Sequence, residues 1–345
     1  MDAEKAAARK NRDKTLSSLT ALDEHICLLD YHCDYDLDGV LESGITSIMG
    51  LSRYVQKIIH SPVITPNPLA GHGGCSTFNV RTPDGKVLMG RNFDYKEARV
   101  LVVWTHPKKG YRSMAVCNQN HLMYADIRKS RCPLRVLGAP YVSMDGINEK
   151  GLACAILELL GKPTKQRNGK TPFTTNVALR GVLDKCANVD EAIAFMEKYD
   201  MHDLLGACYH YFFTDASGQS AIVEYMDNKM YVYRQNKPDE SLKLTNFYIT
   251  EGGKCKEKGR DRYEKMECAL NQNPVMTEDE AMKLLSDVKV YFRSRYKIFM
   301  IATSWSAVYN CTDRSMLLCA GRDYTKKYRL SLDKPLKAVE IKGGL

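Results

Sequence analysis

A tight turn between two strand-like stretches is the feature that most limits how this chain can fold. The turn, Pro83-Asp84-Gly85-Lys86, lies between short stretches rich in Val, Thr, Phe and Tyr, and this pattern predicts a β-hairpin. Because the second strand of a hairpin returns alongside the first, Arg91 and Asp94 are expected close to Cys75. Positive charge beside a thiol lowers the pKa of that thiol, so the hairpin predicts a nucleophile site.

The peptide bond between Gly74 and Cys75 suggests how such a nucleophile is activated. If this bond is cut, Cys75 gains an α-amine with a pKa of about 7.7–8.0, which suits a general base at neutral pH. Asp94 is then expected to hold the amine, and Arg91, at the rim of the site, to stabilise the thiolate. The alternative is a structural cysteine next to a surface Arg–Asp pair, since an isolated cysteine is commonly a small core residue.

An ordered set of motifs resembles the choloylglycine hydrolase family of N-terminal-nucleophile (Ntn) hydrolases. That family includes bile salt hydrolases, penicillin V acylases, acid ceramidase and N-acylethanolamine acid amidase. The motifs are Cys75-Ser-Thr-Phe with Gly90-Arg91-Asn92-x-Asp94, Met144 to Leu152 around Asn148-Glu149, Leu244-Thr245-Asn246, Asp261-Arg262-Tyr263, and Thr303 to Asn310. The resemblance covers about residues 75 to 320. It implies an α+β fold with four αββα layers, autocatalytic cleavage, and hydrolysis of linear amide C–N bonds without a cofactor.

The resemblance also implies roles for single residues. Arg91 matches the arginine that contacts the nucleophile, and Asp94 matches the aspartate that contacts its amine. Asn246 matches the asparagine of the oxyanion hole, where one amide donor is worth about 3–4 kcal/mol. Arg262 matches a late active-site arginine, with Arg260 as a rival. From the residues alone, Asn246 also fits an ordinary turn and Arg262 a helix surface.

Glu158 distinguishes among the members of the family. Ten residues after Asn148, bile salt hydrolases have an asparagine, penicillin V acylases a tyrosine and acid ceramidase-like enzymes a glutamate. An ionised carboxylate cannot donate to an oxyanion, so either the backbone N–H of Glu158 serves or its side chain is protonated. The alternative is a water-exposed strand end. The glutamate favours fatty N-acyl amides over conjugated bile salts as substrates.

Four apolar residues are candidates for an acyl pocket, although such residues more often belong to a core. They are Tyr141, Met144, Leu159 and Phe173.

Composition narrows the class of protein. A content of 44% hydrophobic and 26% charged residues is normal for a soluble globular protein. No apolar run is long enough to span a membrane, and the charged N-terminus lacks the apolar core of a secretory signal. These features predict a cytoplasmic protein. The twelve cysteines are then expected as free thiols, and none of them has zinc-site spacing, so no metal site is predicted.

The net charge of +9 does not by itself indicate a nucleic-acid partner. The lysines are scattered, and the densest run, Lys162 to Lys170, contains Gly and Pro and fits a solvated loop. Residues 1–74 are net acidic whereas the rest of the chain is basic. This asymmetry fits an acidic pro-segment that docks on a basic body.

The pattern of predicted helices and strands divides the chain into two parts. Residues 1–74 are predicted as a helical pro-segment, with helices over 19–29 and 40–59 and a Pro/Gly linker over 61–74. Residues 75–345 are predicted as the catalytic domain, in which strands alternate with helix pairs. Two sheets packed face to face with helices outside are therefore expected.

The sequence as a whole predicts a precursor that is cut before Cys75. Its thiolate would attack the carbonyl of a small-molecule N-acyl amide. Three alternatives stay open: hydrolysis of conjugated bile salts or penicillins, acyl transfer as in isopenicillin N acyltransferase, and an uncut, non-enzymatic member that serves binding or scaffolding. The oligomeric state also stays open, a homo-oligomer included.

Overall fold

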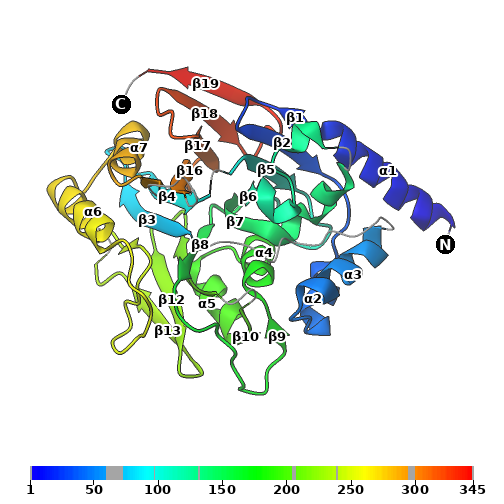
Figure 1. Cartoon of the computed structure of the whole chain (residues 1–345), viewed down its shortest axis with the longest axis horizontal. Coiled ribbons are helices and arrows are strands. Elements are labelled where there is room, and N and C mark those ends of the chain that lie inside the picture. The colour runs from blue at the N-terminus through cyan, green and yellow to red at the C-terminus, as the bar shows by residue number, and fades with distance from the viewer. Residues whose placement is uncertain are drawn as a thin grey trace.

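Two large β-sheets lie face to face and carry helices on their outer sides (Figure 1). The computed structural model describes residues 2–59, 73–96, 98–130, 133–203, 207–237, 240–293 and 300–343. The expected four-layer αββα arrangement is therefore confirmed.

The first sheet has nine strands and the second has eight. In spatial order the first contains β1 (Thr20–Ala21), β2 (Ile26–Tyr31), β5 (Val100–Thr105), β6 (Ser113–Asn118), β7 (Ser143–Asn148), β8 (Ala153–Leu159), β11 (Cys208–Thr214), β12 (Ser220–Met226) and β13 (Lys229–Arg234). The second contains β14 (Lys243–Leu244), β3 (Gly74–Arg81), β4 (Val87–Tyr95), β16 (Met300–Asn310), β17 (Ser315–Ala320), β18 (Lys326–Ser331) and β19 (Ala338–Lys342), with β15 (Tyr291–Arg293) paired to β16. A separate short pair joins β9 (Pro172–Phe173) and β10 (Asp200–Met201).

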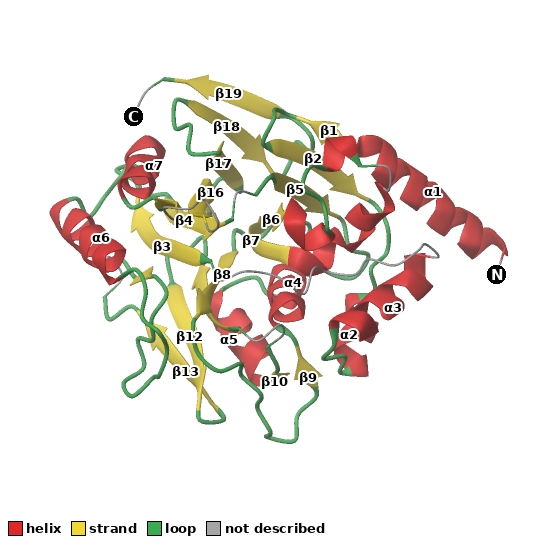
Figure 2. Cartoon of the chain, in the orientation of Figure 1, coloured by secondary structure: helices red, strands yellow, loops and turns green. Residues whose placement is uncertain are grey.

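The helices surround these sheets (Figure 2). They are α1 (Asp2–Ser18), α2 (Leu37–Ser43), α3 (Ile48–Ile59), α4 (Thr175–Lys185), α5 (Val189–Glu197), α6 (Arg260–Gln272) and α7 (Glu278–Asp287), with 3-10 turns η1 (Gln119–Leu122), η2 (Ile127–Lys129) and η3 (Pro133–Val142). Helices α4 and α5 cover the nine-stranded sheet, and α6 and α7 cover the eight-stranded sheet. None of the helices described is long and apolar enough to cross a membrane.

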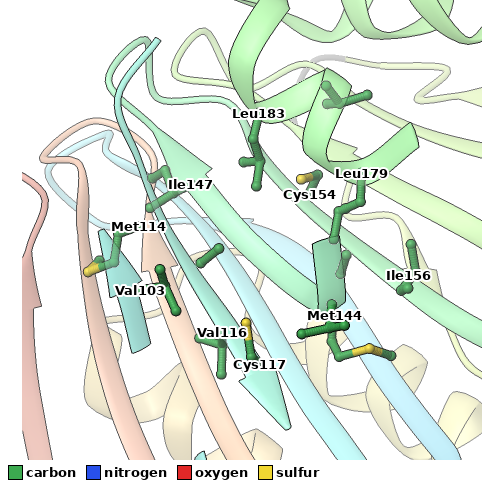
Figure 3. Packing of buried hydrophobic residues seen from close by; sticks show 14 of the residues in the cluster. Val103, Met114, Val116, Cys117, Met144, Ile147, Cys154, Ile156, Leu179 and Leu183 are labelled. Carbon is green, nitrogen blue, oxygen red and sulfur yellow. The ribbon is translucent and has the colours of Figure 1, made fainter. Parts of the chain in front are cut away.

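The central strands are buried on both faces, which explains their nearly continuous apolar sequences. Every residue of β5 is buried. Figure 3 shows Leu179 and Leu183 of α4 among the buried side chains of the nine-stranded sheet, such as Cys154. A second hydrophobic cluster, which includes Phe78 and Met266, joins the eight-stranded sheet to α6 and α7.

The predicted β-hairpin is formed by β3 and β4. At its turn, the Thr82 amide donates to the Lys86 carbonyl over 2.8 Å. Gly85 adopts a φ of 84°, which a residue without a Cβ tolerates readily. The antiparallel register then sets Gly74 opposite Asp94.

The N-terminal segment differs from the prediction. Residues 19–29 form β1 and the first part of β2, so the helix predicted there is wrong. Periodicity cannot separate a short buried strand from a buried helix, and here pairing with β5 decides the outcome. The helix predicted over 40–59 is divided into α2 and α3, because Gly44 ends α2 with a φ of 60°.

The position of β2 bears on how the chain is divided. It pairs in parallel with β5, next to it in Figure 1, and contributes buried residues such as Ile26 and Leu29 to the main hydrophobic cluster. Residues 26–31 therefore belong to the same core as the sheets. The predicted division at residues 74 and 75 stays a prediction about processing, and the linker residues 61–72 lie outside the described residues.

Candidate active site

Cys75 lies near the start of β3, where the two sheets meet. Its side chain is 3% exposed, and it pairs with Phe93 of β4. Burial raises the pKa of the Cys75 thiol, while the charge of Arg91 and the backbone N–H of Glu158 act in the opposite direction. In the uncut chain this thiol is therefore poorly ionised at neutral pH.

Arg91 lies on the thiol side of Cys75 and interacts with its sulfur. It is fully buried, with Nε 3.3 Å from Oδ2 of Asp145 and Nη2 donating to the Ile156 carbonyl over 2.7 Å. The expectation that Arg91 lies at the rim of the site is wrong, because both sheets enclose it. A surface pair between Arg91 and Asp94 is likewise excluded, since each has a different buried partner.

Asp145 of β7 is the carboxylate that balances Arg91. It also accepts hydrogen bonds from Nε1 of Trp305 and from the Tyr309 hydroxyl, both on β16. Burial raises the pKa of Asp145, and the charge of Arg91 opposes this effect. The sequence analysis included Asp145 in a family motif but assigned it no role; a carboxylate within a buried strand is the signal that it needs a cation.

Arg262 contacts the backbone side of Cys75. Its Nη1 donates to the Cys75 carbonyl and to the Ser76 hydroxyl, over 2.7 Å in each case. The same nitrogen pairs with Oδ2 of Asp94 at 3.0 Å. The rival Arg260 is exposed and pairs with Glu257 at the surface.

Asp94 is held from two directions. Arg262 contacts one of its oxygens, and the Thr303 hydroxyl donates to the other over 2.6 Å. All three side chains are buried. A Cβ added at Gly74 would lie 3.0 Å from the first of these oxygens, so Asp94 lies directly beside the residue that precedes Cys75.

Asn246 contacts the backbone nitrogen of Cys75. It follows β14, which pairs with β3, and its Oδ1 accepts from Cys75 N over 2.7 Å and from Nη2 of Arg262 over 2.9 Å. The donors facing Oδ1 determine how the amide is oriented. Its Nδ2 then donates to the Glu158 carbonyl over 2.7 Å. In the uncut chain Asn246, rather than the expected Asp94, thus accepts from the atom that would become the α-amine.

Glu158 lies at the site with both its backbone and its side chain. Its Oε2 accepts from the Gly73 amide over 2.8 Å, two residues before Cys75. A Cβ at Gly73 would lie 2.4 Å from the Asp94 carbonyl oxygen, so a glycine is needed for this close approach. The half-buried Glu158 therefore holds the segment that leads into the predicted cleavage site.

The four acyl-pocket candidates have other contacts. The Tyr141 hydroxyl donates to the Tyr35 carbonyl, and Phe173 stacks on Tyr199 at 4.8 Å between ring centroids. Met144 belongs to the main hydrophobic cluster (Figure 3), and Leu159 is buried next to Glu158. Two of these four are next to site residues along the chain: Met144 directly precedes Asp145, and Leu159 directly follows Glu158. Their assignment to a pocket stays a prediction.

Buried hydrogen bonds that were not predicted from the sequence support the loop that carries Asn246. Nε2 of His210 lies 2.7 Å from the Thr245 carbonyl, and its Nδ1 lies 3.0 Å from Oε1 of Glu224. Glu224 also accepts from the Thr250 amide over 2.8 Å. These hydrogen bonds fix the backbone just before Asn246. A histidine and a glutamate in the neighbouring strands β11 and β12 are the sequence signal for these bonds.

Most of the chain matches a known protein family. Residues 80–324 match the family described as acyl-coenzyme A:6-aminopenicillanic acid acyl-transferase. The chain belongs to this family. The resemblance to Ntn linear amide C–N hydrolases is thereby confirmed.

Individual relatives are more distant. A penicillin V acylase from Pectobacterium atrosepticum is 33% identical over 138 residues, which span 34% of this chain and 37% of that protein. The match therefore covers little more than a third of the relative. A mutant of conjugated bile acid hydrolase from Clostridium perfringens is similar in structure, with a TM-score of 0.54 and 16% identity over 78% of this chain and 97% of that one. Penicillin V acylase from Agrobacterium tumefaciens has a TM-score of 0.54 and 19% identity over 75% of this chain and 87% of that one. At these identities the two structures support the fold.

Proposed function

We propose that this protein is an autoprocessed N-terminal-cysteine amidohydrolase that cleaves the linear C–N bond of N-acyl amides. The observation that carries the proposal is that two atoms of Cys75 have separate buried partners. Its backbone nitrogen donates to Asn246, and its thiol faces Arg91. An Ntn enzyme needs both atoms, the sulfur as nucleophile and the nitrogen as base.

Processing would use the thiol first. The sulfur attacks the Gly74 carbonyl carbon, the bond to Cys75 N breaks, and the nitrogen leaves as an amine. Water then hydrolyses the thioester and releases a carboxylate at Gly74. Glu158, which accepts from the Gly73 amide, and Asp94, beside Gly74, would hold this segment during the cut.

Turnover would follow the same order with a free substrate. The α-amine, held by Asn246, takes the thiol proton and passes it to the leaving amine. The thiolate forms an acyl thioester, and water then releases the acid. The Glu158 backbone N–H, directed at the sulfur, supports a role as oxyanion donor; the Asn246 amide can join it once its Nδ2 is released from the Glu158 carbonyl.

The finer assignment is to fatty acyl amides as small-molecule substrates. Its support is Glu158, the residue shared with acid ceramidase-like members, and the buried leucines Leu157 and Leu159 on either side of it. A cytoplasmic location is part of the same proposal. Among the described residues the cysteines are free thiols.

Intact mass and substrate ranking test the proposal. Purified protein should contain a fragment that runs from Cys75 to Leu345, and this material should hydrolyse a fatty acyl amide with a higher kcat/KM than penicillin V or a glycine-conjugated bile salt. A tenfold preference for the bile salt, about 1.4 kcal/mol, would reverse the ranking. A persistent single chain without turnover would support the non-enzymatic alternative instead.

Acyl transfer is a second candidate, because the matching family is described as an acyl-transferase. In that reaction an amine replaces water in attacking the thioester. Adding an amine acceptor during turnover separates the two reactions. An amide product at the expense of free acid supports transfer, whereas unchanged release of acid supports hydrolysis.

A further inference from the structure

A cluster of two histidines and one aspartate lies outside the site described above. Oδ1 of Asp30 is 2.6 Å from Nε2 of His106, and Oδ2 of Asp30 is 3.0 Å from Nε2 of His32. The three sets of ligand atoms all lie within 4.8 Å of one another. The two imidazole rings stack with centroids 5.4 Å apart and planes 8° apart, so both direct Nε2 at the same carboxylate.

The parallel pairing of β2 with β5 creates this cluster. Tyr31 pairs with Thr105, so the next residue of each strand, His32 and His106, leaves the sheet at the same edge. Asp30 lies two residues before His32, on the same face of the strand. The His32 amide donates to the Thr15 hydroxyl over 2.9 Å, which ties this end of β2 to α1. The backbone positions of the two strands thus bring the three side chains together.

We propose that Asp30, His32 and His106 form a site for a divalent first-row transition metal ion, with Zn²⁺ as the probe. Two imidazole nitrogens and one carboxylate oxygen are a ligand set that suits this ion. Zinc ligands lie about 2.0–2.2 Å from the metal and hence about 3.4 Å from one another, so small side-chain rotations suffice. His32 and His106 also line a cavity of about 320 Å³, which leaves room for water as a fourth ligand.

The site joins the two sides of the proposed cut. Asp30 and His32 belong to the N-terminal segment, and His106 belongs to the body of the protein. Ion pairs cross the same junction, among them Lys108 with Asp34 at 2.9 Å and Lys185 with Asp38 at 2.6 Å. A metal ion would add a further link. It would hold the N-terminal segment in place whether or not the chain is cut, so the inference does not depend on the proposed enzymatic activity.

One charge works against the metal. Lys14 of α1 is close enough to influence both Asp30 and His32. Removing this cation should therefore strengthen binding, which gives the proposal a variant with the opposite sign.

The experiment titrates Zn²⁺ into the full-length Cys75→Ala protein by calorimetry. This background stays uncut if Cys75 is the nucleophile, and it removes that thiol as a ligand. We expect one zinc ion per chain, at least about tenfold weaker binding in His106→Gln, and tighter binding in Lys14→Met. His25→Gln is the matched control, a histidine of the same segment outside the cluster, and should bind as tightly as the parent. Equal affinity in His106→Gln and the parent would overturn the proposal.

Two further measurements keep the result decisive. Co²⁺ in place of Zn²⁺ should give a visible spectrum without thiolate charge-transfer bands, whereas such bands alone would place the metal on cysteines and reject the site. If His106→Gln does not fold, Asp30→Asn keeps the shape of the side chain but removes its charge, and the same loss of affinity is expected. Zinc should also raise the melting temperature of the parent and not of the folded variant. Failure of these tests leaves the amidohydrolase proposal untouched, since the protein tested has no nucleophile.

Discussion

The β3–β4 hairpin and the strand β2 lie on opposite sides of the proposed cleavage site in the sequence. Different interactions hold them in the fold. The hairpin carries Arg91 and Asp94, which are fully buried and each paired with an opposite charge. The strand β2 is held mainly by apolar side chains such as Leu28, and its one charged residue, Asp30, contacts His32 and His106 near the end of the strand. The residues proposed as catalytic therefore depend on buried charge balance, whereas the N-terminal segment depends on hydrophobic burial.

The largest expected effect concerns the nucleophile. Cys75→Ala should abolish the fragment beginning at residue 75 and lower turnover more than about a thousandfold, because no other described thiol has these partners. Mass spectrometry and a steady-state amide assay measure the two effects. Cys268→Ala, which changes an exposed thiol, is the matched control. Full activity in Cys75→Ala would show that the hairpin does not carry the nucleophile.

The second prediction tests the buried charges. Arg91→Ala should lower the free energy of unfolding by about 3–5 kcal/mol, since it leaves the Asp145 carboxylate buried without its cation. Urea denaturation of variant and parent measures this loss. Arg260→Ala, at an exposed ion pair, should change stability by less than about 0.5 kcal/mol. Equal stability of the two variants would contradict the argument from burial.

The third prediction tests the apolar side of the comparison. Leu28→Ala should cost about 2–5 kcal/mol of stability, because Leu28 is 1% exposed within the main hydrophobic cluster. Met49→Ala, at a 60% exposed side chain of α3, should cost little. The same burial predicts that the N-terminal fragment stays bound after cleavage, which size-exclusion chromatography of cut protein can show. If the fragment separates freely and Leu28→Ala is as stable as the parent, hydrophobic burial does not hold β2 in place.

The smallest effect concerns the pH dependence of thiol reactivity. Burial raises the pKa of Cys75 in the uncut chain, so at neutral pH its thiolate fraction is below that of an ordinary cysteine and grows only at higher pH. Iodoacetamide should therefore modify Cys75 at least about tenfold more slowly than the exposed Cys268, a difference of about 1.4 kcal/mol. Peptide mapping across about pH 6 to 10, an interval that includes the ordinary thiol pKa of about 8.5, measures both rates. After cleavage Cys75 should react faster; equal rates in cut and uncut protein would argue against activation by the new amine.

Local features of the sequence were sufficient for part of this fold. The turn at residues 83–86 predicts the hairpin, because a tight turn and its flanking strands depend only on neighbouring residues. The start of α5 is also local, since the Asn188 side chain accepts from the amide of Glu191, three residues on, as an N-cap does. The ordered motifs from Cys75 to Asn310 indicated the family before any contact was known.

Only the tertiary structure decided which charges meet and what β2 becomes. Arg91 and Asp94 share a strand, but their partners Asp145 and Arg262 come from β7 and α6, and nothing local to the hairpin specifies them. The run of apolar residues at 26–29 fits a buried helix or a buried strand equally well until β5 provides unpaired backbone groups beside it. Parallel pairing and the burial of charge both depend on segments far apart in the chain. The sequence by itself therefore determined the local elements around Cys75, the proposed nucleophile, and the assembled sheets determined the partners that surround them.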